Sequence, residues 1–113
     1  MRDRALSRAK LESLGGGRFR VSGVLDATTV GELLKQSGER FANLEGLEVD
    51  LAGVSEGDSA GLALLIEWLR LAKDAKRAIQ FANVPGQISA LARISEVEDL
   101  LSANVTTTAA ARA

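Results

Sequence analysis

Cysteine and histidine are both absent from this sequence of 113 residues, and each of these absences excludes a class of chemistry. The chain has no cysteine, which excludes disulfides, thiolate metal sites and thiol catalysis. It has no histidine either, so an ordinary Ser-His-Asp triad is impossible and the commonest general base at neutral pH is missing.

Strong charge of one sign and long apolar runs are also missing. The 14 basic and 15 acidic residues leave a net charge of −1, without the basic field that nucleic-acid binders use. No apolar run approaches the roughly 20 residues of a transmembrane helix. The composition, with 46% apolar and 26% charged residues, is that of an ordinary globular protein. The length predicts one domain with its own core.

The two ends of the chain are predicted to lie outside the folded domain. The first ten residues, MRDRALSRAK, carry four basic side chains and no apolar stretch, so we do not expect a signal peptide. The last residues, TTTAAARA, are low in complexity and offer no large apolar side chain to bury. We therefore expect residues 1–9 to be a flexible lead-in, residues 10–102 the domain, and residues 103–113 a disordered tail.

Hydrophobic periodicity and turn residues predict strands that alternate with helices. A hairpin is expected first, because two short alternating segments flank the glycines of residues 15–17. Asp26, Thr28 or Thr29 can cap the next helix, and Glu32 would complete a capping box with Thr29. Strands are expected over residues 10–14, 18–25, 46–54 and 78–84, and helices from residue 28, over residues 59–75 and 87–94, and from a Ser95 cap to residue 101.

This order, β-β-α-β-α-β-α-α, indicates a small α/β domain. Strands that alternate with helices form crossover units, which make a largely parallel sheet. The sheet is therefore expected to be mixed, with the antiparallel hairpin at its start and helices packed on it.

One motif, Gly57-Asp58-Ser59-Ala60-Gly61, has the G-x-S-x-G spacing of a nucleophile elbow. Only a lysine or a lone carboxylate could activate Ser59, and Lys73 and Lys76 lie several turns down the helix that Ser59 opens. We therefore do not expect a serine hydrolase. Two interpretations stay open: Asp58 or Ser59 is simply a helix cap, or the exposed hydroxyl at the helix start is a docking or switching point.

The helix that begins at Ser59 is apolar over more than half of its circumference. A helix on a sheet needs an apolar stripe of only about 100°, so something must cover the surplus, which includes Leu64, Trp68 and Leu71. Neighbouring helices of the same domain are one possible cover. The other is a partner protein that binds Trp68 with Leu64 or Leu71, since tryptophan is enriched in interface hot spots.

The same motif resembles the hallmark of the STAS domain family. A strand is followed by DSAGLALL at residues 58–65, and the next strand by Asn83-Val84-Pro85. The likeness extends from about Lys10 to Ser102. STAS domains occur in anti-sigma factor antagonists and in the tails of sulfate transporters, and the resemblance makes Ser59 the counterpart of the hydroxyl that serine kinases phosphorylate in antagonists.

Within that family, DSAGLALLIEWLRLAK and NVPGQISALARISEVEDLL are most similar to the small cytoplasmic subunit of the Gram-negative Mla transporter, which maintains outer-membrane lipid asymmetry. The resemblance implies a non-enzymatic domain without metal or cofactor, held at the inner membrane by the ATPase of this ABC transporter. It assigns partner binding or switching to Asp58, Ser59, Ala60, Leu64 and Trp68. The alternative it leaves open is an anti-sigma factor antagonist, whose partner kinase phosphorylates Ser59.

Overall fold

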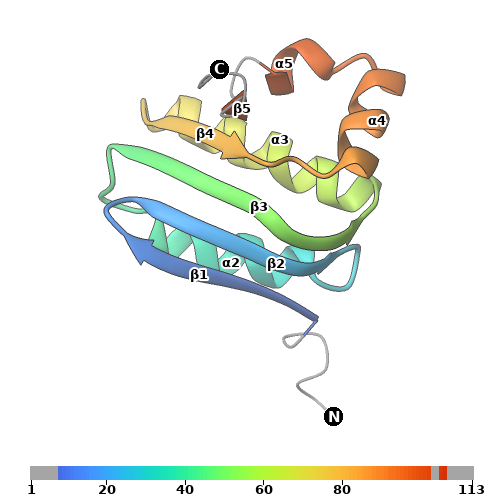
Figure 1. The fold of residues 1–113 in the computed structure, drawn as a ribbon. Coiled ribbons are helices and arrows are strands. Elements are labelled where there is room, and N and C mark those ends of the chain that lie inside the picture. Colours follow the sequence, from blue (N-terminus) through green and yellow to red (C-terminus); the bar gives the residue numbers. More distant parts are fainter. Residues whose placement is uncertain (1–7, 103–104, 107–113) are drawn as a thin grey trace.

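The computed structural model describes residues 8–102 and 105–106 (Figure 1). The expected α/β architecture is confirmed, and in this part of the chain one sheet has the strand order β1-β2-β3-β4-β5. β1 and β2 are antiparallel, and every other neighbouring pair is parallel. The elements are β1 (Ala9–Gly15), β2 (Arg18–Leu25), α2 (Val30–Arg40), β3 (Gly46–Gly57), α3 (Ser59–Asp74), β4 (Ala78–Ala82), α4 (Gly86–Ile94), α5 (Glu98–Ser102) and β5 (Val105–Thr106).

The hairpin between β1 and β2 forms where the three glycines predict it. Gly15, Gly16 and Gly17 all have positive φ, at 87°, 64° and 82°. A side chain at Gly17 would also collide with the Gly46 carbonyl oxygen, only 2.5 Å from its Cβ position. These residues are therefore turn glycines that the backbone requires.

α2 and α3 lie side by side on one face of the sheet, and the core fills the space between the two layers (Figure 1). The inward residues of β2 and β3 alternate with outward ones, as strand geometry requires. On the outward face the charges are paired across strands: Arg20 lies opposite both Glu12 of β1 and Asp50 of β3. The fully buried side chains include Val21, Leu25, Leu33, Val49, Leu51, Leu65, Trp68, Phe81 and Ile88.

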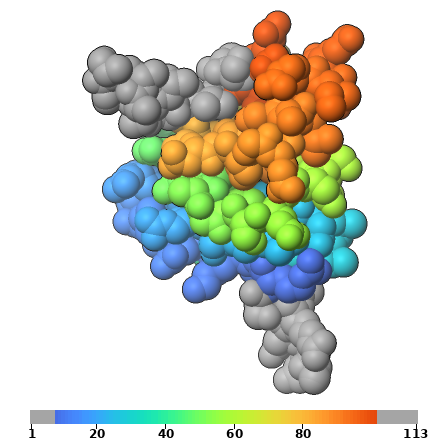
Figure 2. Space-filling view, turned by 45° about the vertical axis from the view of Figure 1, so that its right-hand side comes forward, coloured from blue at the N-terminus to red at the C-terminus, as the bar shows by residue number. Residues whose placement is uncertain are grey.

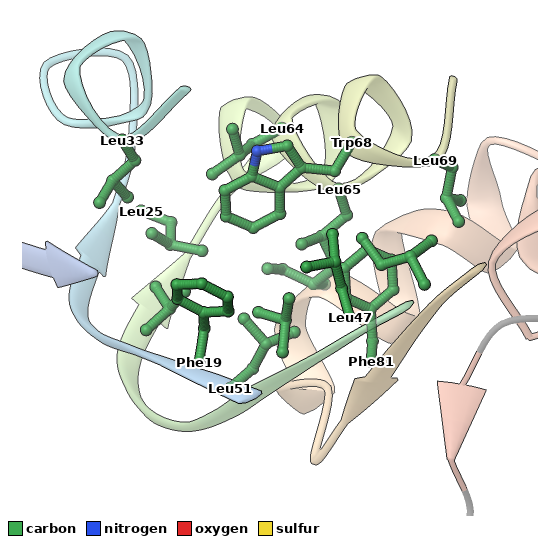
Figure 3. Close-up of a cluster of buried hydrophobic side chains, with 14 of the residues drawn as sticks. Phe19, Leu25, Leu33, Leu47, Leu51, Leu64, Leu65, Trp68, Leu69 and Phe81 are labelled. Carbon is green, nitrogen blue, oxygen red and sulfur yellow. The ribbon is translucent and has the colours of Figure 1, made fainter. Parts of the chain in front are cut away.

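Trp68 belongs to this core, which corrects its assignment to a partner-binding surface. Its ring points from α3 into the layer between helices and sheet, near Leu33 and Phe19 (Figure 3). Only 2% of Trp68 is exposed, and its indole Nε1 donates a hydrogen bond of 2.8 Å to the hydroxyl of buried Ser37. The surplus apolar arc of α3 is thus covered by α2, a neighbouring helix of the same domain. Of Leu64, Trp68 and Leu71, only Leu71 is exposed, at 36%.

Two predicted caps are wrong in detail. Thr29 stands at the N-cap of α2 but makes no capping hydrogen bond with its side chain. Its buried hydroxyl donates instead to the Val24 carbonyl at 2.8 Å and accepts from the Asp26 amide at 3.0 Å, which ties the end of β2 to the helix. Ser95 ends α4 as its C-cap, whereas α5 begins only at Glu98.

Both predicted domain limits also shift. β1 begins at Ala9, and the guanidinium of Arg8 lies 2.6 Å from the carboxylate of Asp26, so the ordered domain starts before residue 10. Val105 and Thr106 pair with Phe81 and Ala82 as a short fifth strand that the sequence did not predict. The rest of the predicted lead-in and tail, residues 1–7, 103–104 and 107–113, lies outside the described residues. Among the helices that are described, none is long and apolar enough to cross a membrane.

Candidate functional site

The turn between β3 and α3 presents Ser59 to solvent. Asp58 is the N-cap of α3, and its Oδ1 accepts a hydrogen bond of 2.8 Å from the Ala60 amide. Ser59 is the first helical residue and is exposed. Within the described chain its hydroxyl makes no side-chain hydrogen bond. The structure thus assigns the capping role to Asp58 and leaves the Ser59 hydroxyl free for a partner or a modification.

The two glycines that flank Ser59 are explained by packing against α4. A Cβ on Gly57 would lie 2.7 Å from Cδ1 of Ile88. A Cβ on Gly61 would lie 3.0 Å from the Leu25 Cβ and 3.2 Å from the same Ile88 methyl. Because a fully buried isoleucine lies against the backbone at both positions, larger residues would push α4 away. The G-x-S-x-G spacing here therefore reflects a close approach of elements.

The turn is also anchored by hydrogen bonds from both sides. The Gln87 side-chain oxygen, from α4, accepts from the Gly57 amide at 3.0 Å, and the Leu25 carbonyl of β2 accepts from the Asp58 amide at 3.2 Å. Sequence reasoning missed Gln87 and Ile88 as supports of the site. Their only signal was their place in the NVPGQIS segment that follows β4, since nothing local shows that α4 folds back onto the turn.

The usual general bases are not found beside Ser59: the chain has no histidine. Lys73 is fourteen residues further along α3, which corresponds to about 21 Å at 1.5 Å per residue. The neighbouring Asp58 carboxylate is engaged in capping. In the part of the chain that the structure describes, no group of three acidic residues could hold a metal ion. The geometry at Ser59, an exposed hydroxyl on an anchored turn, is compatible with recognition by a partner.

Three acidic residues, Asp26, Glu56 and Asp58, are among those that line a small hollow of about 140 Å³ at this end of the sheet, which we call the acidic hollow. The pKa of Asp26 is lowered to about 2, first by hydrogen bonds from the Thr28 hydroxyl and amide and then by Arg8. Asp26 is the only one of the three in an ion pair with a described residue. Among the described residues, one ion pair, that of Arg8 with Asp26, opposes the three carboxylates, so acidic groups predominate at this hollow.

An apolar groove runs between the starts of α2 and α3, directly beside Ser59. It encloses about 320 Å³, and we call it the α2–α3 groove. Two residues of the predicted site, Ala60 and Leu64, line it, although Leu64 is only 3% exposed. The full lining is Ala27, Val30, Gly31, Leu34, Ala60, Ala63 and Leu64. The structure therefore brings Asp58, Ser59, Ala60 and Leu64 together at one end of the molecule and places Trp68 in the core.

Figure 2 turns this end of the molecule toward the reader. The last residues of β3, in yellow-green, come to the surface between α4 above and the connection from β2 to α2 below.

A family model described as "Mlab, STAS domain" matches residues 11–102. No curated protein matches the chain. Several solved structures share its fold, including the following three. SpoIIAA, an anti-sigma factor antagonist in its unphosphorylated form, is 18% identical with a TM-score of 0.62, over 80% of this chain and 83% of its own.

A sulfate transporter family protein from Wolinella succinogenes is 15% identical with a TM-score of 0.64, over 85% of this chain and 80% of its own. An anti-sigma factor antagonist from Mycobacterium paratuberculosis is 20% identical with a TM-score of 0.59, over 81% of this chain and 80% of its own. At these identities the three structures establish the fold alone.

Proposed function

Because this chain belongs to the STAS domain family, through a match over most of its length, we propose that it is a non-enzymatic subunit of an Mla-type phospholipid transporter. In this role it binds the ATPase subunit of the ABC system, supports its activity and so helps to maintain outer-membrane lipid asymmetry. It would lie in the cytoplasm, held at the inner membrane through that partner. The observation that carries the proposal is that the matching family model is the MlaB-like one.

The geometry around Ser59 supports a role in binding. The turn is held by Gln87 and Leu25, so little conformational freedom is lost when a partner docks against it. Beside it lies an apolar groove, which gains free energy when a partner displaces its water. An exposed hydroxyl next to an apolar groove on a rigid turn is a combination suited to a specific protein contact.

The runner-up function is an anti-sigma factor antagonist that a partner kinase switches by phosphorylating Ser59. One observation favours it: Ser59 is exposed in the first turn of α3, where the helix dipole stabilises a phosphate. Another opposes it, because Asp58 is adjacent and Glu56 lies at the same turn, and both carboxylates repel the added charge. We therefore place this function second.

The test is co-purification with the ATPase encoded nearest to this protein, using wild type, Ser59→Ala and Ser59→Asp. Both variants should fold like wild type, since Asp58 provides the cap and the Ser59 side chain has no structural contact. If the hydroxyl is part of the contact, both Ser59→Ala and Ser59→Asp, which remove it, bind the ATPase less well. Mass analysis of wild-type protein from cells accompanies the binding measurement. A stoichiometric phosphate on Ser59, together with full function of Ser59→Ala, would reject the transporter role and support the antagonist.

A further inference from the structure

We propose that the α2–α3 groove receives a basic amphipathic helix of the partner, whose apolar side chains enter the groove while a neighbouring lysine or arginine faces the acidic hollow. This deepens the proposed function, on which it rests for the identity of the partner as the ATPase subunit. The family match specifies no such segment, and the groove and its charges supply the chemistry.

The groove has the size and lining for side chains of a helix. Its volume of about 320 Å³ corresponds to roughly ten water molecules at ~30 Å³ each. Its walls are formed by apolar residues of two helices, among which Val30 and Leu34 are only half-buried although they pack against the core. Apolar side chains spaced three or four residues apart on a partner helix would displace this water and complete the burial.

Charge selects the kind of helix. The residues that line the acidic hollow and the groove are close in the sequence. Asp26 of the hollow directly precedes Ala27 of the groove, and Asp58 of the hollow lies two residues before Ala60 of the groove. Consecutive Cα atoms are about 3.8 Å apart, so a cation close to the apolar anchors of the partner reaches the hollow. The excess of carboxylates among the described residues there favours lysine or arginine and disfavours an acidic segment.

The same charge argues against two other occupants. An anionic membrane surface would be repelled by Asp58 and Glu56. In a two-fold contact with a second copy of this chain, the acidic hollows of the two copies would lie close together and repel each other. A basic helix from a different protein meets neither penalty.

Two glycines of α2 provide a matched pair of variants. Gly31 lies in the groove, Gly38 lies outside it, and a Cβ at either position has no atom within 4 Å. Both Gly31→Leu and Gly38→Leu should therefore fold, with improved helix propensity. Only the first fills the groove. A second pair tests charge: Glu56→Lys reverses a charge at the hollow, and Glu39→Lys reverses one near the far end of α2.

The probes are two synthetic peptides of about 14 residues, roughly four helical turns, one of leucine and lysine and its twin of leucine and glutamate. Fluorescence anisotropy measures their dissociation constants with each folded variant. We expect the lysine peptide to bind wild type and Gly38→Leu equally, and to bind Gly31→Leu and Glu56→Lys about tenfold or more weakly, the effect of losing one anchor contact. Glu39→Lys should change the constant by less than about threefold, as a distant surface charge does.

The proposal is overturned if Gly31→Leu binds the lysine peptide as well as Gly38→Leu does, or if the glutamate peptide is preferred. It is also overturned if wild type is a dimer that Gly31→Leu converts to a monomer, since a second copy then fills the groove. The ATPase is titrated with the same variants. If the ATPase does not bind wild type although the lysine peptide binds the variants as expected, the transporter role fails and the groove assignment stands. If it binds both glycine variants equally, the groove assignment fails and the transporter role stands.

Discussion

At the scale of single residues, two side chains, buried Trp68 and partly exposed Asp26, are held in place by hydrogen bonds within the domain. Trp68 reaches Ser37, and Ser37 in turn donates to the Leu34 carbonyl at 2.7 Å. Phe41 packs beside the indole with its ring centre 5.6 Å away. Asp26, at the end of β2, is surrounded by the Thr28 and Arg8 donors. Each arrangement leads to a stability prediction.

Trp68→Ala should destabilise the domain by about 3–5 kcal/mol, the cost of truncating a large buried aromatic side chain. Trp68→Phe should cost less, because it keeps most of the buried area and loses the hydrogen bond to Ser37. Chemical unfolding gives both values, and the fluorescence of this single tryptophan in the folded wild type should be that of a buried indole. If Trp68→Ala kept wild-type stability and lost only partner binding, Trp68 would return to the interface.

Asp26 should make stability depend on pH in acid. Its pKa in the folded protein is lowered from 3.8 to about 2, so its stabilising effect is present above 3.8 and is lost as pH falls toward 2. The stability advantage of wild type over Asp26→Asn, measured by urea unfolding at a series of pH values, should therefore shrink across this window. Thr28→Val removes the main hydrogen-bond donor and should move the loss to higher pH. A difference that stays constant down to pH 2 would contradict the assignment.

At the scale of elements, α3 and α4 end in the same way, without the glycine that usually marks such an end. After α3, the Lys76 amide bonds to the Lys73 carbonyl and the Arg77 amide to the Ala72 carbonyl, which is a Schellman motif. After α4, Glu96 and Val97 repeat the pattern. Lys76 and Glu96 both have positive φ, at 57° and 62°, a conformation that costs energy for residues with a Cβ.

Lys76→Gly should therefore stabilise the protein, by up to about 1 kcal/mol, because glycine adopts this conformation without strain. The matched control is Lys73→Gly, which places glycine in the last turn of α3 and should destabilise by about 1 kcal/mol. Urea unfolding of the two variants beside wild type measures both changes. Destabilisation by both would show that Lys76 contributes a contact that outweighs its backbone strain.

At the scale of the whole molecule, the sheet brings distant segments to one end. The carboxyl ends of β2 and β3 and the starts of α2 and α3 form the groove, the acidic hollow and the Ser59 turn. α4 reaches this end through Gln87 and Ile88. This surface combines an exposed hydroxyl, an apolar groove and acidic residues, a combination suited to binding.

We predict that the purified protein hydrolyses neither activated esters nor ATP, since the chain has no histidine and no P-loop sequence. The assay uses p-nitrophenyl acetate and ATP, with Ser59→Ala as control. Ester turnover that disappears in Ser59→Ala would replace the binding function with a hydrolase.

Much of this protein could be predicted from local patterns. Strand alternation, helix periodicity and turn glycines act over a few residues, so the order of the elements and the mixed sheet followed from them. The exposed turn at Asp58 and Ser59 followed in the same way, since a strand end and a helix start are both local signals. The absence of histidine excludes the triad through composition alone, whatever the fold.

The remaining features depend on which elements meet in space. Whether Trp68 faces a partner or α2 cannot be decided from the apolar arc of α3, because both would bury it equally well. The two glycines beside Ser59 acquire their meaning only when Ile88 of α4 packs on them. The Thr29 hydroxyl donates to the Val24 carbonyl of β2 and makes no capping hydrogen bond with its own helix. Short-range periodicity determines how each segment can fold, whereas contacts across 30 residues or so, such as Gly57 to Gln87, form only when the layers have packed.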